Sequence, residues 1–416
     1  MYLHVDINAY FATLLQQETP SLRGQPLGII KDIGRSCIIA CSKEAKLFGI
    51  QTGSSRAEAL ARCPQLKLVK ADFQLSLSAT MKLQTLFAQF SPDFEVFSLD
   101  ESFIPFAPLQ RLYDNPQQLA GQIQEQIKVV LGEWVTCNVG IGRTRFLAKM
   151  VGEVSPKGTI SSVGGENGTE NDAALATTEQ SLLSSTTFSD VCGIGHRLSK
   201  RLSHVGITVP YQINFVPQQD LERWFGPWWS VELQKMARGD EPAFLARLTE
   251  KEKPMRSISR SITLFSTTKD EGKIRQILYN LCAEITYKAR RQGLAGRLVG
   301  VSLTGQQHIW SQHVTTRQPI NHTSTLFAAV TKLIDQRPRS FPVIRFAVYS
   351  SLLETTTLTQ LSLLPDWWQR ERLETALDAV NDRYGLFTVH SAFLPKKEII
   401  MPEVTGFFGD KQYYLT

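Results

Sequence analysis

The 416-residue sequence contains neither a long hydrophobic run nor an organised cysteine pattern. No apolar stretch approaches the roughly eighteen residues of a membrane-spanning helix, and the N-terminus lacks the basic-then-apolar order of a signal peptide. The six cysteines form no CxxC pair and no cluster with histidine at zinc spacing. These absences argue against membrane-spanning and disulfide-rich secreted proteins. We expect reduced thiols, a cytoplasmic location and no membrane partner.

The charge of the chain is concentrated in one block. Residues 251–350 hold sixteen Lys and Arg against five Asp and Glu, a net charge of +11, whereas the whole chain carries +6. So basic a block predicts contact with a polyanion, and its lack of an aromatic-rich pattern favours a duplex backbone over a single strand. Arg256 and Arg260 are candidate contacts to nucleic acid. We expect them on one face of an alternating strand, together with small polar side chains.

Two short acidic sites lie in segments that read as buried strands. Asp6 belongs to the apolar run 1–7, and Asp100 and Glu101 lie within the run 94–106. Burying a carboxylate is costly unless a cation compensates it, and three carboxylates from two adjacent strands suit a pair of Mg²⁺ ions. One ion would lower the pKa of an attacking hydroxyl and the other would stabilise a leaving pyrophosphate. The alternative is that Asp6 caps the following helix and the acidic pair closes a turn.

A length of 416 residues is too long for one ordinary core and predicts two to four domains. In the first of them, the order of strand-like and helix-like segments fits a mixed sheet with helices on one face. In that part we expect strands at 1–6, 28–30, 36–41, 94–106 and 135–141, and helices at 9–17, 44–48, 54–62, 72–90, 116–131 and 145–154. The Ser/Thr/Gly/Asn-rich residues 160–180 indicate a surface loop and linker before a helical region at 181–245. Further on we expect strands at 255–264, 297–304 and 343–350, and helices at 271–291 and 366–383.

A Gly-Ile-Gly turn between two expected helices is typical of a helix-hairpin-helix. Gly193 and Gly195 would let backbone N–H groups approach a phosphate, and Arg197 and Lys200 add positive charge. An ordinary tight turn between helices is the alternative. The amphipathic helix that follows favours the phosphate-binding interpretation.

Five short motifs follow one another along the chain: Asp6 to Ala12, Cys37 to Gly49, Ser98 to Ser102, Val139 to Gly142, and Leu147 to Lys149. In content and order they resemble the motifs of the Y-family lesion-bypass DNA polymerases. Within that family the chain is most similar to the UmuC-type catalytic subunit of DNA polymerase V. The resemblance implies an α+β right hand with a ferredoxin-like palm (1–10 and 72–165), small fingers (11–71), a helical thumb with a helix-hairpin-helix (175–245), an α/β little finger (251–352) and a tail (353–416).

The resemblance also implies a reaction and its catalytic groups. A primer 3′-hydroxyl would attack the α-phosphorus of a deoxynucleoside triphosphate opposite damaged template, with two Mg²⁺ ions held by Asp6, Asp100, Glu101 and the carbonyl of Ile7. Glu101 would lie nearest the primer terminus. No proofreading nuclease motif is visible, so we expect error-prone synthesis.

The same resemblance assigns residues around the nucleotide. Phe11 occupies the steric-gate position that excludes a 2′-hydroxyl, with Tyr10 as the alternative candidate, although both could simply be core residues. Lys43 and Lys46 stand where many members have Tyr and Arg, and replacing Arg by Lys keeps the charge but loses the bidentate fork. Lys157 lies in Ser-Pro-Lys-Gly, where relatives carry Lys-Pro-x-Gly, and is expected to reach the triphosphate.

Near the C-terminus, one segment resembles the short Gln-Leu-x-Leu-Phe peptides that dock on the bacterial sliding clamp. Its anchors would be Gln360, Leu361, Leu363 and Leu364, and a strand edge is the alternative. The expected partners are primed template DNA, a dNTP and the clamp. The resemblance also suggests a UmuD-like subunit, a recombinase filament and a nucleoid-associated location.

Two other functions compete with synthesis. The first is a polymerase-like scaffold that binds DNA and partner proteins without extending a primer. The second is a nucleotide cyclase on a related palm, which would share the paired acids but would leave the helix-hairpin-helix and the basic block unexplained.

Overall fold

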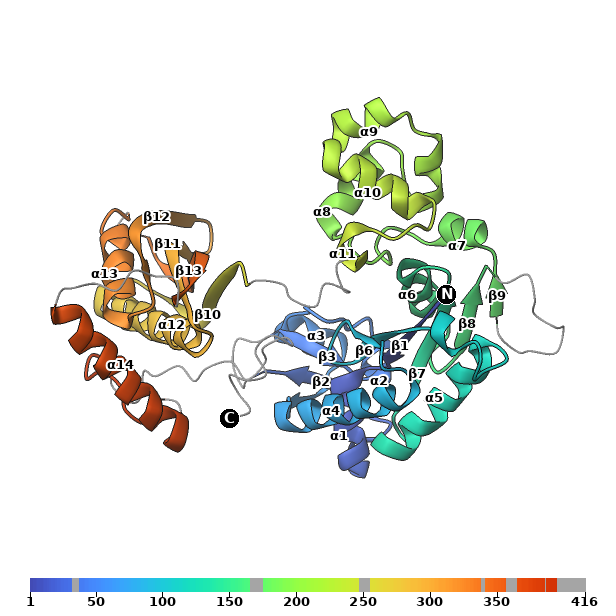
Figure 1. Ribbon diagram of the computed structural model, residues 1–416, viewed down its shortest axis with the longest axis horizontal. Helices are drawn as coiled ribbons and strands as arrows, with labels where there is room; N and C mark the ends of the chain where they lie inside the picture. Colours follow the sequence, from blue (N-terminus) through green and yellow to red (C-terminus); the bar gives the residue numbers. More distant parts are fainter. Residues whose placement is uncertain are drawn as a thin grey trace. The chain divides into compact units, whose positions relative to one another are not determined.

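The computed structural model divides the chain into two compact units, Met1–Lys251 and Glu252–Thr416 (Figure 1). It describes residues 1–31, 37–164, 175–246, 255–337, 341–356, 365–385 and 387–394. Among the described residues, none of the helices combines the length and the apolar character that crossing a membrane requires.

The first unit is built around a six-stranded mixed sheet. Its order is β5 (Glu95–Val96), β6 (Glu101–Pro105), β1 (Tyr2–Ile7), β7 (Cys137–Gly142), β8 (Ile160–Val163) and β9 (Leu175–Thr177). The first four strands pair antiparallel, whereas β7, β8 and β9 run parallel. The expected loop over 160–180 is therefore wrong at both ends. The buried centre of β8 is Ser161-Ser162, so polar composition concealed a strand.

The acidic pair lies at a hairpin, not inside one continuous strand. Strand β5 pairs antiparallel with β6, and the backbone N–H groups of Phe97 and Ser98 both donate to the carbonyl of Glu101, at 3.0 and 3.1 Å. The single strand expected over 94–106 is wrong because the chain turns at Ser98–Asp100. Asp100 therefore belongs to the turn and Glu101 is the first residue of β6.

Helices cover both faces of this sheet, which corrects the expectation of one covered face. Helices α4 (Phe73–Phe90) and α5 (Pro116–Leu131) pack with Leu3, Val5 and Ile7 of β1. On the other face α6 (Arg145–Val154) contacts β7 and β1. A Cβ built on Gly140 of β7 would lie 2.0 Å from the carbonyl oxygen of Ala148. The glycine in the Val-Gly-Ile-Gly motif thus lets α6 approach the sheet closely.

Gly140→Ala is expected to destabilise the first unit by about 1–3 kcal/mol or more. The added methyl group would overlap the backbone carbonyl of Ala148, which cannot move independently of α6. Gly121→Ala is the matched control: this glycine lies inside α5, and nothing stands within 4 Å of its built Cβ. That change should stabilise the protein by roughly 0.5–1 kcal/mol, since alanine favours a helix. Urea unfolding of both variants checks the opposite signs.

Two smaller subdomains complete the first unit. A three-stranded sheet has the order β3 (Ile38–Cys41), β2 (Leu27–Ile30) and β4 (Lys67–Lys70), with α1 (Tyr10–Glu18), η1 (Pro20–Leu22), α2 (Lys43–Lys46) and α3 (Arg56–Arg62). The short η2 (Ala107–Leu109) follows β6. A helical region contains α7 (Glu179–Ser185), α8 (His196–His204), η3 (Pro210–Phe215), α9 (Gln218–Phe225), α10 (Pro227–Ala237) and α11 (Ala243–Ala246).

The second unit is a four-stranded antiparallel sheet whose core is formed with α12 (Glu271–Arg291) and α13 (Thr323–Ile334). The strand order is β10 (Ser257–Thr268), β13 (Val343–Thr355), β11 (Leu294–Thr304) and β12 (Ile309–Ile320). The sequence missed α13 and β12. Strand β12 lacks a buried alternating face, because nearly all of its residues are exposed or half-buried, so it gave no period-two signal.

The sequence suggested that Arg260 shares a face with the small polar residues of β10, but the structure places it on the other face. Strand alternation groups it with buried Ile258, and its guanidinium forms an ion pair with Glu284 of α12. Both partners are nearly buried, with side chains 11 % and 4 % exposed. The expected placement was wrong because the arginine lies on the helix-covered side of the sheet.

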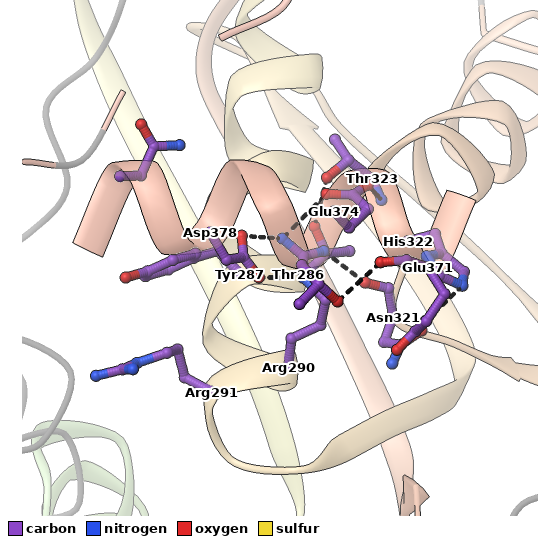
Figure 2. Close-up of polar contacts among 12 residues, drawn as sticks. Thr286, Tyr287, Arg290, Arg291, Asn321, His322, Thr323, Glu371, Glu374 and Asp378 are labelled. Atoms are coloured by element: carbon purple, nitrogen blue, oxygen red, sulfur yellow. Dashed lines mark hydrogen bonds and ion pairs between the residues drawn. The ribbon is translucent and has the colours of Figure 1, made fainter. Parts of the chain in front are cut away.

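Helix α14 (Pro365–Tyr384) packs on α12 through a network centred on Arg290 (Figure 2). The Arg290 guanidinium binds Asp378 through two nitrogens, at 2.6 and 2.8 Å, and lies 3.1 Å from Glu374. It also donates to the backbone carbonyl of Asn321 at 2.8 Å. The helix predicted in the tail is thus joined to the second unit by charged, largely buried contacts.

Candidate active site

The three predicted acidic ligands meet at one end of β1 and β6. Asp6 lies directly opposite Glu101 in the antiparallel register, and the N–H of Ile7 donates to the carbonyl of Asp100 at 3.2 Å. Asp6 does not cap the next helix: the N-cap of α1 is Ala9, and no side chain caps it. The helix-cap half of the alternative is therefore wrong, whereas its other half, a turn at the acidic pair, agrees with the bend at Ser98–Asp100.

Asp6 and Asp100 occupy an electrostatically unfavourable environment. Burial, together with the negative charges of Glu101 and Asp100, raises the pKa of Asp6 to about 8. Burial and the Glu101 charge also raise the pKa of Asp100, although its carboxylate accepts a 2.9 Å hydrogen bond from the hydroxyl of Ser98. Buried, mutually repelling carboxylates of this kind are stabilised in their charged form by a nearby cation.

Glu101 has compensating partners that the other two acids lack. Its Oε2 accepts a hydrogen bond from Nε2 of His4 at 3.0 Å and contacts Nζ of Lys149 at 2.5 Å. Burial alone would raise the pKa of Glu101, but these two contacts outweigh it and lower the pKa to about 2. The sequence gave His4 no role, and Lys149 was noted only as part of a motif.

The acidic site fits hard divalent cations in its chemistry, although its side chains are not yet arranged around one. Within the described ranges, no group of three or more His, Cys, Asp or Glu side chains has a geometry that could hold a metal ion. Oxygen donors are nevertheless what Mg²⁺ prefers, and Asp6 and Asp100 supply two buried carboxylates whose charged forms a bound cation would stabilise. The Oε1 atom of Glu101 and the carbonyl of Ile7 are further oxygen donors at this end of the sheet.

The two aromatic candidates for the steric gate have different surroundings. The ring of Tyr10 is buried, and its hydroxyl donates to the carbonyl of Ser76 at 2.6 Å and contacts the hydroxyl of Thr80 at 2.8 Å. Phe11 is half-buried and packs edge-to-face on Phe73 with ring centroids 6.0 Å apart. Tyr10 is thus committed to the core, which favours Phe11 as the residue facing a nucleotide sugar.

The predicted triphosphate-binding lysines are all exposed and lie in different settings. Lys43 and Lys46 are on α2, and the ammonium of Lys43 lies 5.1 Å from the ring centroid of Trp134. Lys157 lies in the turn after α6. Asn138, the register partner of Asp6, links that turn to the acidic site. The sequence gave Asn138 no role.

The Asn138 side chain bridges the last turn of α6 and the turn that follows it. Its amide nitrogen donates to the carbonyl of Gly152 at 2.8 Å, and its oxygen accepts from the N–H of Gly158 at 2.7 Å. Because Asn138 pairs with Asp6 between β7 and β1, the turn is anchored next to the acidic end of the sheet.

The predicted phosphate-binding turn precedes α8. Gly193 has a φ of +90°, and a Cβ there would lie 2.6 Å from the ring of Phe244, so glycine is required on both counts. Gly195 is the N-cap of α8 and has open space around it. Arg197 and Lys200 on α8 are exposed, as is Arg256 in the second unit. The clamp-peptide residues Gln360, Leu361, Leu363 and Leu364 lie outside the described residues.

Comparisons with known proteins place two family matches along the chain. Residues 5–153 match the impB/mucB/samB family, and residues 255–363 match the impB/mucB/samB family C-terminal domain. A protein named DNA polymerase IV from Pelotomaculum thermopropionicum is 27% identical over 392 residues, covering 92% of each chain. DNA polymerase IV 2 of Bacillus subtilis is 25% identical over 392 residues, covering 92% of this chain and 91% of its own.

Solved structures share the fold. A Y-family DNA polymerase chimera of Dbh and Dpo4 superposes with a TM-score of 0.68 at 20% identity, covering 85% of this chain and 99% of its own. An insertion ternary complex of Dbh DNA polymerase gives a TM-score of 0.53 at 19% identity, covering 84% and 98%. The predicted α+β right-hand fold is confirmed by these likenesses.

Proposed function

From the membership of this chain in the impB/mucB/samB family of Y-family translesion DNA polymerases, we propose that it extends primers by two-metal-ion nucleotidyl transfer at Asp6, Asp100 and Glu101. The observation that carries this assignment to these residues is the convergence of the three acids at one end of β1 and β6. The relatives quoted above are DNA polymerase IV proteins, so the UmuC-type subfamily stays a prediction.

The metal ions in this proposal would be Mg²⁺, held by Asp6, Asp100, Glu101 and the carbonyl of Ile7. When bound, they would activate the primer hydroxyl and neutralise the charge on the triphosphate. The protein's own residues position the groups: the β1–β6 register sets Asp6 opposite Glu101, and the Ser98 hydroxyl holds Asp100. Lys43, Lys46 and Lys157 would bind the triphosphate as single positive charges.

The binding of primed template DNA is supported by two surfaces, each within its own unit. In the first unit, the Gly193–Gly195 turn and the exposed Arg197 and Lys200 would contact a phosphate backbone. In the second unit, exposed Thr263 lies opposite exposed Arg345 in the sheet register, on the face away from the buried side chains. We propose Arg345 on this face, and the exposed Arg256 just before β10, for backbone contact. We no longer propose Arg260, whose charge Glu284 already neutralises.

Further parts of the proposal rest on the family resemblance alone. They are the two-ion Mg²⁺ requirement, the sliding clamp, a UmuD-like subunit, a recombinase filament, a nucleoid-associated location, and the division into palm, fingers, thumb, little finger and tail.

Primer extension tests the proposed function most directly. A primed template with Mg²⁺ and dNTPs should be extended by the wild-type protein and not by the double variant Asp100→Ala/Glu101→Ala. Binding of the duplex by both proteins should be equal, because neither acid belongs to the two surfaces proposed for backbone contact. If neither protein extends the primer, even with the clamp and partner proteins added, while both bind DNA equally, the scaffold function is correct instead.

Sugar selection provides a prediction for Phe11. Phe11→Ala should raise incorporation of ribonucleotides relative to deoxyribonucleotides by on the order of 100-fold, because removing the ring opens space at the 2′ position. Tyr10→Phe is the control, since it keeps the ring and removes only a hydroxyl bound within the core. Single-nucleotide insertion with rNTP and dNTP substrates measures the ratio. An unchanged ratio in Phe11→Ala would remove Phe11 from the gate.

A further inference from the structure

Lys149 and His4 contact the same oxygen of Glu101. Nζ of Lys149 lies 2.5 Å from Oε2, and Nε2 of His4 lies 3.0 Å from it. In the described part of the chain both contacts converge on Oε2, which leaves Oε1 for another ligand. A carboxylate held by one oxygen keeps a fixed orientation, whereas one held by neither can rotate away from a metal.

Both partners are themselves fixed. The His4 side chain is 1 % exposed and packs against the ring of Phe103, with centroids 4.9 Å apart. Its Nε2 must carry a proton to donate to the Glu101 carboxylate at 3.0 Å. The Lys149 side chain is 6 % exposed, and its ammonium lies 5.3 Å from the ring centroid of Phe97.

The backbone determines where Lys149 stands. Helix α6 can bring Lys149 to Glu101 because Gly140 lets that helix lie close against β7. Gly140 is itself the register partner of His4 between β7 and β1. Lys149 has a second carboxylate partner, Glu153, at 2.9 Å, but that side chain is 39 % exposed. The buried partner, Glu101, is therefore the one that requires the charge of Lys149.

We propose that Lys149 and His4 are positioning residues that hold Glu101 by Oε2 and so present Oε1 to the metal ion and the primer terminus. This inference rests on the proposed function, because Glu101 acts on a metal and a primer only in a polymerase. Neither residue touches the substrate. Their effect is expected to pass entirely through Glu101.

A double-mutant cycle with two readouts tests this. In single-turnover insertion with Mg²⁺, Lys149→Met should lower the rate about 10–100-fold with little change in the dNTP concentration at half-maximal rate, and Lys149→Arg should restore most of it. In the Glu101→Gln background, Lys149→Met should have less than about a two-fold further effect. Glu153→Gln, which removes the exposed partner, should stay within about two-fold of the wild type. Independently of activity, Mn²⁺ affinity measured by electron paramagnetic resonance should fall about ten-fold in Lys149→Met.

The possible results distinguish a failure of the positioning role of Lys149 from a failure of the polymerase assignment. If the wild-type protein extends primers but Lys149→Met lowers the rate equally in both backgrounds, Lys149 has a purely structural role and the proposal is overturned. If Lys149→Met does not fold, His4→Gln carries the same cycle, with the same expected loss of additivity. If the wild-type protein itself does not extend primers, the polymerase assignment fails, whereas an unchanged Mn²⁺ affinity in a folded Lys149→Met overturns the positioning role alone.

Discussion

Asp6→Asn is expected to lower primer extension by roughly 10³-fold or more while making the metal-free protein more stable. The loss follows from removing one of the buried carboxylates proposed to hold the metal ions, and a metal contributes several kcal/mol to the transition state. The gain follows from the same burial. The Asp6 carboxylate repels Glu101 and Asp100, and a neutral amide of the same shape does not.

The direction in which stability changes with pH follows from the raised pKa of Asp6. The pKa of Asp6 is raised from 3.8 to about 8 by folding, so the folded state holds a proton that the unfolded chain releases above pH 4. The contribution of Asp6 to the stability of the metal-free protein should therefore be largest below pH 4. It should decline by on the order of a few kcal/mol as the pH rises towards 8. Asp6→Asn should flatten this decline.

Urea unfolding in EDTA at pH 5 and pH 8, and again with Mg²⁺, measures these effects. Mg²⁺ should stabilise the wild-type protein more than the variant, because a ligand that binds the folded state shifts the unfolding equilibrium. A wild-type protein whose stability does not change between pH 5 and pH 8 in EDTA, or an active Asp6→Asn variant, would contradict the placement of Asp6 in the metal site.

The sequence singled out the acidic residues, which the structure brings together, but it did not reveal their surroundings. Asp6 and Glu101 could be found because carboxylates in apolar strands are rare, and the family motifs fixed their order. His4 and Lys149 gave no such signal, because their roles depend on the β1–β6 register and on how closely α6 approaches β7. His4 and Glu101 are 97 positions apart in the sequence, and Lys149 and Glu101 are 48 positions apart. Contacts over such separations are set by tertiary packing, about which the periodicity of the sequence carries no information.

The strand and helix expectations failed where composition and burial disagree. Helix α12 was predicted with its observed bounds because its buried positions recur at helical spacing. Strand β8 was missed because small serines fill its buried positions, and β12 because its side chains are mostly exposed. Arg260 was placed on the wrong face because its ion pair with Glu284 makes a charged residue compatible with the helix-covered side.

Arg290→Ala is expected to destabilise the second unit by about 3–5 kcal/mol, because it leaves two partly buried carboxylates without their cation. Asp378 and Glu374 have side chains only 16 % and 15 % exposed, and Arg290 also satisfies the carbonyl of Asn321 (Figure 2). Helix α14 contributes both acids, so its packing on α12 should be the first structure lost. Urea unfolding, together with limited proteolysis at α14, measures the effect.

Arg275→Ala is the matched control, since it changes the same residue type on the same helix. Arg275 pairs with Asp335 at 2.6 Å, but their side chains are 33 % and 57 % exposed, and such pairs contribute at most about 1 kcal/mol. Arg290→Ala should therefore release α14 to protease while Arg275→Ala should not. Equal stability losses in the two variants would mean that burial of the Arg290 network does not hold α14 in place. The apolar contacts around α12 would then have to account for the packing instead.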